Sequence, residues 1–317
     1  MNQNHKTLYR PEFEHDACGI GFVARTTGVP GHDIVAYALE SIACMEHRAG
    51  VDADGKSGDG AGILTQLPHR LLASEIEDLP APGDYAVGMF FFPPEKVAES
   101  KQLAESNLIK MAQAPRAKWG GGASEEKIEH PGLPTFRWRL PKLNPEALGS
   151  TARRLCPEIH QFIIWRPAHI ERGEPFERFL YSYRKQLTRS AVEQTNTDFY
   201  VVSLSAQTIV HKGLMLSPYL ADFYQDLTHP LYESAIATVH TRYSTNTAAT
   251  WRRAQPFRMI AHNGEINTLQ GNVNWMRARV STLASALWPE GLEVLHPIIY
   301  DGGSDSGKFD NVLELIV

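Results

Sequence analysis

The predicted strands of this 317-residue chain follow one another in runs, without strict alternation with helices. Short apolar or alternating segments bounded by turn residues predict strands at 19–25, 61–67, 85–92, 134–139, 158–165, 199–211, 235–241 and 257–262. Longer amphipathic patterns predict helices at 33–47, 94–113, 144–155, 174–188 and 266–285. Regular strand–helix–strand units would indicate a doubly wound parallel sheet, so this order instead predicts an α+β layered fold.

The composition is that of an ordinary soluble protein and excludes several classes of partner. The chain is 43% hydrophobic and 21% charged, with a net charge of −5, so no basic field would attract nucleic acid or an anionic membrane. No apolar run approaches the roughly 20 residues of a membrane span. The N-terminus lacks the apolar core of a secretory signal, and three cysteines are too few for a disulfide framework. We expect a cytoplasmic protein in a reducing compartment.

Cys18 stands near the start of the chain in the stretch "HDACGIGF". By itself it has two interpretations, a buried small side chain or a nucleophile, whereas Cys44 and Cys156 fit the buried interpretation. No Cys-His-Asn protease signature surrounds Cys18. Cleavage between Ala17 and Cys18 would give Cys18 a free α-amino group with a pKa of about 7.7–8.0, which can act as its base. A nucleophilic Cys18 therefore predicts that residues 1–17 are a propeptide.

Hydrolysis of an amide also requires groups that bind the developing oxyanion and the charges of the substrate. Asn263 and Gly264 offer a side-chain amide beside an unobstructed backbone N–H, which suits an oxyanion hole. For a free amino-acid amide, Arg242 or Arg48 could bind the α-carboxylate, and Asp305 could bind the α-ammonium. Taken singly, Arg242 and Asp305 favour a solvated or structural ion pair, whereas together with Cys18 and Asn263-Gly264 they favour a site.

These segments resemble the class II glutamine amidotransferases. The resemblance rests on "CGIGF", "DADGKSGDGAGI", "HTRYSTNT", "AQPFR", "AHNGEINT" and "GGSDS", and it extends from about residue 11 to the last residue. Within the family the similarity is closest to the N-terminal glutaminase domain of glutamate synthase large subunits. It implies an N-terminal-nucleophile (Ntn) hydrolase fold, a four-layer αββα sandwich of two antiparallel sheets.

The family's residue roles carry over to matching positions of this chain. The resemblance makes Cys18 the nucleophile and base, and Asn263 and Gly264 the oxyanion hole. It makes Arg242 the ligand of the glutamine carboxylate and Asp305 the ligand of its α-amino group. Arg48 and Thr245 would support the pocket.

The resemblance also implies a larger enzyme than these residues can form. The family passes ammonia to a synthase domain that carries FMN and an iron–sulfur cluster, and the electrons come from FAD and NADPH on a small subunit or from ferredoxin. We expect no cofactor or metal in this chain, because a cluster needs several closely spaced cysteines. Residues 310–317 form an uncapped apolar helical pattern, so we expect residues 18–317 to be a glutaminase domain truncated at its C-terminus.

Two alternatives remain open at this point. The first is a non-catalytic domain that binds glutamine without turning it over. The second is an amidotransferase that serves a different acceptor, in purine or amino-sugar synthesis. The first would leave Cys18 without a catalytic role, and the second would change only the domain that receives the ammonia.

Overall fold

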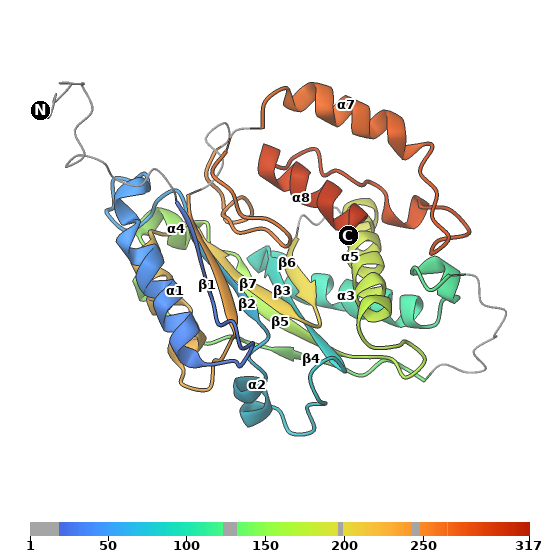
Figure 1. The fold of residues 1–317 in the computed structure, drawn as a ribbon, viewed down its shortest axis with the longest axis horizontal. Coiled ribbons are helices and arrows are strands. Elements are labelled where there is room, and N and C mark those ends of the chain that lie inside the picture. The colour runs from blue at the N-terminus through green and yellow to red at the C-terminus, as the bar shows by residue number, and fades with distance from the viewer. Residues whose placement is uncertain (1–18, 123–131, 196–198, 243–247, 265) are drawn as a thin grey trace, which may run out of the picture.

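Two antiparallel sheets of four strands each pack face to face, with helices on both outer sides (Figure 1). The structure is a computed structural model, and it describes residues 19–122, 132–195, 199–242, 248–264 and 266–317. The layers follow the order helix, sheet, sheet, helix. The predicted α+β class and the four-layer αββα sandwich are therefore confirmed.

The first sheet has the strand order β1-β8-β2-β7. Its strands are β1 (Ile20–Ala24), β8 (Ile236–Thr241), β2 (Ala61–Gln66) and β7 (Thr208–Gly213). Ile20 pairs with His240, and Thr241 pairs with Ala61. Because neighbouring strands are antiparallel, the start of β1, the end of β8 and the start of β2 all lie at one end of this sheet.

Helix α1 (His32–Cys44) covers the outer face of the first sheet. Its buried side chains are Ile34, Val35, Ala38 and Ile42. This spacing of three to four residues is the stripe that a sheet-packed helix buries. Cys44 is exposed, so the prediction that it is buried was wrong. It lies two residues after Ile42, and two residues turn about 200° around a helix, away from the buried stripe.

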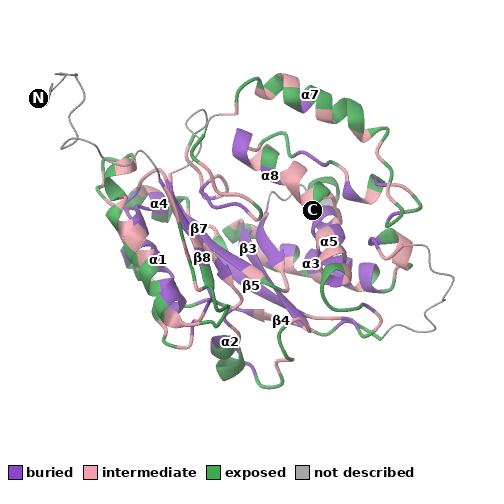
Figure 2. Cartoon of the chain, in the orientation of Figure 1, coloured by how far each residue is buried: buried purple, intermediate pink, exposed green. Residues whose placement is uncertain are grey.

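The second sheet has the order β4-β5-β3-β6. Its strands are β4 (Phe136–Arg139), β5 (Glu158–Trp165), β3 (Tyr85–Phe92) and β6 (Tyr200–Ser205). All of β3 is buried, as Figure 2 shows by colour. Alternate residues such as Val87 and Met89 join the core between the sheets, while Phe90 and Phe92 join the core under α3 (Val97–Ala112) and α5 (Glu174–Thr195). A strand buried on both faces explains the uninterrupted apolar run.

The remaining helices lie around this sandwich. They are α2 (His69–Glu75), α4 (Ser150–Arg154), α6 (Leu220–Phe223), α7 (Leu269–Val280) and α8 (Asp305–Ile316). Short 3₁₀ helices are η2 (Glu46–Arg48), η3 (Pro94–Lys96), η4 (Arg116–Lys118), η5 (Pro145–Ala147), η6 (Ser217–Tyr219), η7 (Gln225–Thr228) and η8 (Glu293–Leu295). Helix α8 is held by Glu314, whose Oε1 accepts hydrogen bonds from Arg184 (2.7 Å) and Arg258 (2.6 Å).

The predicted strand 199–211 is two strands in different sheets. β6 pairs with β3, whereas β7 pairs with β2. The chain turns at Ser205, whose Oγ accepts hydrogen bonds from the N–H groups of Gln207 (2.9 Å) and Thr208 (3.2 Å). A polar side chain that binds the backbone this way favours a turn over a continuous strand.

The predicted strand at 257–262 is absent. The N–H groups of Met259 and Ile260 donate to Asp310 Oδ1 at 2.7 and 3.3 Å, and the N–H of His262 donates to Gln255 Oε1 at 3.4 Å. Side chains therefore take the place of a neighbouring strand in satisfying this backbone.

Three buried histidines predict a specific loss of stability in mild acid. Burial lowers the pKa of His160, His211 and His240 to about 4, whereas an unfolded histidine titrates near 6.5. Between these values the unfolded chain binds more protons than the folded one, so stability falls as the pH falls. We expect the free energy of unfolding to drop by about 3.5 kcal/mol between pH 6 and pH 5. Urea unfolding at the two pH values measures this, and His211→Phe should remove about a third of the drop. An equal free energy of unfolding at pH 6 and pH 5 would show that these rings titrate normally.

Candidate active site

Three of the segments that carry the family resemblance meet at one end of the first sheet. The N–H of Thr241, at the end of β8, donates to the carbonyl oxygen of Gly19 at 2.7 Å. The next N–H, that of Arg242, donates to the carbonyl oxygen of Gly60 at 2.8 Å. These bonds extend the β1-β8-β2 ladder beyond the regular strands, and they bring "CGIG", "HTRY" and "GDGAG" together.

Gly19 also lies close to Asn263, which belongs to the segment "AHNGEINT". A methyl group at Gly19 would lie 2.7 Å from the carbonyl oxygen of Thr241 and 3.3 Å from Asn263 Oδ1. The first distance is too short for a real contact, so only glycine fits here. Cys18, the predicted nucleophile, and Thr245 lie outside the described residues. The described neighbour of Cys18 in the chain therefore lies beside the predicted oxyanion-hole residue.

Arg242 has a strained backbone and a carboxylate partner. Its φ angle is 99°, in the region that favours glycine, and a non-glycine residue there is often part of a functional site. Its Nε lies 3.4 Å from Asp59 Oδ2. The same oxygen accepts a hydrogen bond from the N–H of Gly50 at 2.9 Å, two residues after Arg48 at the end of η2. Asp59 therefore joins the loop after Arg48 to Arg242.

The glycines of "GDGAG" have a packing role. A methyl group at Gly60 would lie 2.9 Å from the Cβ of Ala254, and one at Gly62 would lie 2.5 Å from the carbonyl oxygen of Gln255. The segment that carries Ala254 and Gln255 therefore crosses closely over β2. These contacts account for the glycines without a phosphate ligand.

Asn263 and Gly264 are exposed, while Asp305 lies buried beside the same segment. Asp305, at the start of α8, accepts a hydrogen bond from the N–H of Ile266 at 3.3 Å through Oδ2, and Oδ1 accepts one from Ser306 N–H at 2.7 Å. Asp305 thus contacts the loop that carries Asn263. The predicted role of Asp305 as a ligand of the substrate ammonium remains a prediction.

Two residues at this end of the sheet were not predicted as site residues from the sequence. Asp59 contacts Arg242, and the side chain of Gln255 contacts the peptide of His262, next to Asn263. Asp59 could have been found from the sequence, because it lies between two glycines and this pattern indicates a carboxylate in a tight turn. Gln255 had no comparable signal, because its partner is seven residues away in a segment predicted to be a strand.

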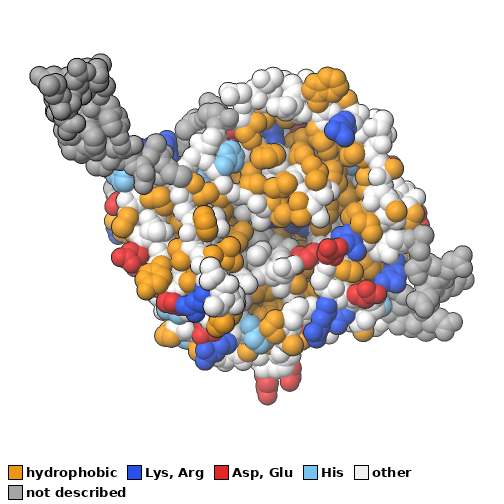
Figure 3. Space-filling view, viewed as in Figure 1, with side chains coloured by type: hydrophobic (Ala, Val, Ile, Leu, Met, Phe, Trp, Pro, Cys, Tyr) orange, Lys and Arg blue, Asp and Glu red, His pale blue; other side chains and the backbone are white. Residues whose placement is uncertain are grey.

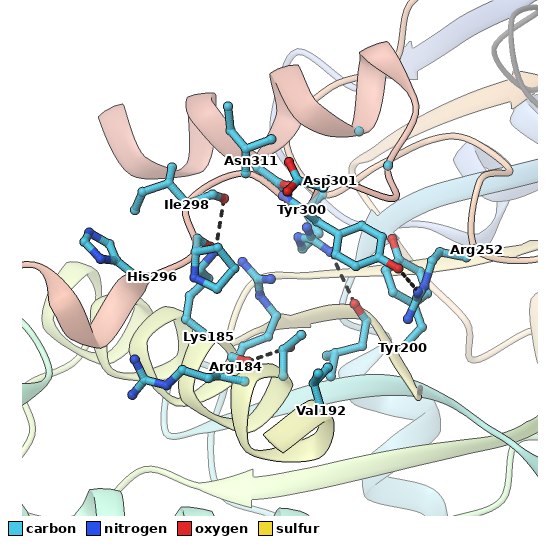
Figure 4. A pocket seen from close by; sticks show the side chains of 18 of the residues that line it. Arg184, Lys185, Val192, Tyr200, Arg252, His296, Ile298, Tyr300, Asp301 and Asn311 are labelled. Carbon is cyan, nitrogen blue, oxygen red and sulfur yellow. Dashed lines mark hydrogen bonds between the residues drawn. The ribbon is translucent and has the colours of Figure 1, made fainter. Parts of the chain in front are cut away.

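A cavity of about 770 Å³ lies apart from these residues, between α5, α7 and α8 (Figure 4). Cationic side chains line it, but several already contact protein oxygens. Arg184 and Arg258 bind Glu314, and Lys185 Nζ donates to the carbonyl oxygen of Ile298 at 3.0 Å. Arg252 Nη1 donates to the Tyr300 hydroxyl at 2.7 Å. We therefore place the candidate site at the end of the sheet, where the predicted residues converge.

The surface adds little to this assignment. Figure 3 shows apolar side chains gathered between α7 and α8. The exposed apolar side chains of these two helices include Trp275, Phe309 and Ile316. Among the described residues, no helix has the length and apolar character that a membrane crossing needs. Within the same ranges, no group of three His, Cys, Asp or Glu residues is placed to hold a metal ion.

Comparison with known proteins agrees with the family resemblance seen in the sequence. The family model described as glutamine amidotransferases class-II matches residues 18–317. The chain is 41% identical over 312 residues to the glutamate synthase [NADPH] large chain of Bacillus subtilis, covering 98% of this chain and 19% of that protein. It is 41% identical over 323 residues to ferredoxin-dependent glutamate synthase 2 of Synechocystis, covering 100% of this chain and 19% of the relative. For glutamate synthase [NADH] of Saccharomyces cerevisiae the identity is 40% over 317 residues, with coverages of 98% and 14%. The chain thus spans less than a fifth of the length of these relatives.

Proposed function

The chain belongs to the class II glutamine amidotransferases, and from this premise we propose that it is the glutaminase domain of a glutamate synthase large chain. Its reaction would be the hydrolysis of L-glutamine to glutamate and ammonia. The observation that carries the proposal is the meeting of Gly19, Arg242 and Asn263 at one end of the first sheet. The family match that begins at Cys18 supports a mature chain starting there.

The proposed chemistry needs Cys18 at a free N-terminus, after removal of residues 1–17. The α-amino group takes the thiol proton, and the sulfur attacks the amide carbon of glutamine. The resulting oxyanion accepts hydrogen bonds from the Asn263 side chain and the Gly264 N–H. As the C–N bond breaks, the proton passes to the leaving nitrogen and ammonia departs, which leaves a γ-glutamyl thioester on Cys18. Water then hydrolyses the thioester, releasing glutamate and restoring the thiol.

Substrate recognition is assigned to charged groups around the same end of the sheet. Arg242 would bind the α-carboxylate, held by Asp59, while Asp305 would bind the α-ammonium. Arg48 and Thr245 would complete the pocket. Asp59 helps Arg242 in this arrangement because its carboxylate forms an ion pair at 3.4 Å with Nε of the partly exposed guanidinium.

The remaining steps would take place outside these residues. We propose that ammonia passes to a synthase domain of the same full-length polypeptide, with FMN and an iron–sulfur cluster, for reductive amination of 2-oxoglutarate. The electron donor differs among the relatives, whose names specify NADPH, NADH or ferredoxin. A small subunit with FAD or a ferredoxin would therefore be the partner. The composition favours a cytoplasmic location.

The test is covalent labelling with diazo-oxo-norleucine, an electrophilic glutamine analogue, combined with N-terminal sequencing. We expect a mature chain that begins at Cys18 and acquires one adduct on that residue, with loss of glutamine hydrolysis in proportion to labelling. L-Glutamine added in excess should slow the labelling. A folded, processed protein whose Cys18 stays unmodified would overturn the proposal.

A further inference from the structure

The peptide group of His262, directly before Asn263, is held by two side chains. His240 Nε2 lies 3.0 Å from the carbonyl oxygen of His262, and Gln255 Nε2 donates to the same oxygen at 3.2 Å. Gln255 Oε1 also accepts the hydrogen bond from the His262 N–H at 3.4 Å. Gln255 thus binds both polar groups of residue 262, as a neighbouring strand would. This pairing matters because the segment 257–262 forms no strand of its own.

Both side chains are buried and suited to a fixed position. His240 is 1% exposed and Gln255 is 2% exposed. Burial lowers the pKa of His240 to about 4, so its ring is neutral at physiological pH. A carbonyl oxygen can only accept a hydrogen bond, so the bond to His262 requires the tautomer that carries its proton on Nε2. The bond to His262 therefore persists across the neutral pH range.

The backbone of each of these two residues is also held in place by neighbouring strands. His240 lies in β8 between two neighbours, paired with Ile20 of β1 and with Gly62 of β2. The carbonyl oxygen of Gln255 packs directly over Gly62, where a side chain would collide with it. His240 is therefore anchored in the strand whose Thr241 binds Gly19, and Gln255 is anchored against the neighbouring strand β2.

We propose that His240 and Gln255 are positioning residues, which hold the His262 peptide and thereby fix the positions of Asn263 and Gly264, the proposed oxyanion donors. The inference rests on the proposed function, because it assigns Asn263 and Gly264 to the oxyanion hole. The physical reason is that an oxyanion hole works only if its donors are in place before the charge develops. A displacement of about 1 Å can lower the rate about 100-fold. Neither residue is assigned a contact with glutamine itself.

The test compares leucine substitutions with a variant that keeps the donor. In the full-length polypeptide that carries this chain, we expect His240→Leu and Gln255→Leu each to lower kcat about 10- to 100-fold, with KM changed less than about threefold. His240→Gln, whose amide nitrogen can replace Nε2 as donor, should recover most of the lost kcat. Each rate is divided by the number of active sites that diazo-oxo-norleucine labels to completion. This normalisation leaves out protein that is unfolded or unprocessed.

His211→Leu is the matched control. His211 is also buried in the first sheet, but its Nδ1 faces the Tyr232 hydroxyl at 3.4 Å, away from residue 262. This variant should lose stability and keep the kcat per labelled site. If His240→Leu and Gln255→Leu keep the wild-type kcat per labelled site, or if His240→Gln is as slow as His240→Leu, the positioning role is wrong. A wild-type protein that labels but releases no ammonia would instead contradict the proposed function.

Discussion

Replacing Cys18 by alanine is expected to abolish glutamine hydrolysis, lowering kcat by at least about 10⁴-fold. The proposed mechanism has no other nucleophile, so the γ-glutamyl thioester cannot form. Binding of glutamine should persist, because Arg242 and Asp305 are unchanged. Ammonia release measures the rate, and mass spectrometry should find no adduct of diazo-oxo-norleucine on the variant.

The other two cysteines provide matched controls. Cys44 is exposed, and Cys156 is half-buried with a pKa raised to about 12 by burial, which keeps its thiol protonated. Cys44→Ala and Cys156→Ala should each keep the wild-type rate within about twofold, since neither thiol has a place in the proposed chemistry. Ammonia release by Cys18→Ala at the wild-type rate would favour a different nucleophile. Glutamine binding without turnover in the wild-type protein would favour the non-catalytic alternative.

Replacing Asn263 by alanine is expected to lower kcat by roughly 10²–10³-fold while KM changes little. The side-chain amide is proposed to bind the oxyanion, which exists only in the transition state and the tetrahedral intermediate. Its loss should therefore appear in kcat rather than in substrate binding. Asn263→Asp should be slower still, because a carboxylate would repel the oxyanion.

Asn267→Ala is the control for this experiment. Asn267 is an exposed residue of the same segment, and its backbone carbonyl, rather than its side chain, accepts the hydrogen bond from Asn272. We expect its rate to stay within about twofold of wild type. A comparable loss in Asn263→Ala and Asn267→Ala would point to general disturbance of the loop. An increase in KM without a fall in kcat would assign Asn263 to substrate binding instead.

Much of the fold follows from local pattern. The run at 85–92 predicted a strand, and it is β3, buried on both faces. The apolar spacing after residue 33 predicted the helix α1 that covers the first sheet. Local pattern succeeds in both because the apolar residues of each element record what it buries: an uninterrupted run for β3, which is buried on both faces, and one stripe for α1.

Local pattern failed where the backbone partners are distant in the sequence. The apolar stretch 199–211 predicted one strand, yet its halves pair with β3 and β2 in different sheets. The stretch 257–262 predicted a strand, yet its N–H groups bind Asp310 and Gln255. Strand propensity reports how well side chains suit a half-buried surface, and it does not specify which group accepts the hydrogen bonds.

The sequence by itself determined the family, the layered fold class and the identity of the proposed nucleophile, Cys18. These depend on residue types and spacings, which the sequence shows without any knowledge of where the residues lie in space. Only the tertiary structure decided that Gly19 lies beside Asn263, that Asp59 pairs with Arg242, and that His240 and Gln255 hold the His262 peptide. Those contacts join residues up to 244 positions apart, as with Gly19 and Asn263. They arise because antiparallel pairing brings the ends of β1, β8 and β2 to one edge, which no local pattern encodes.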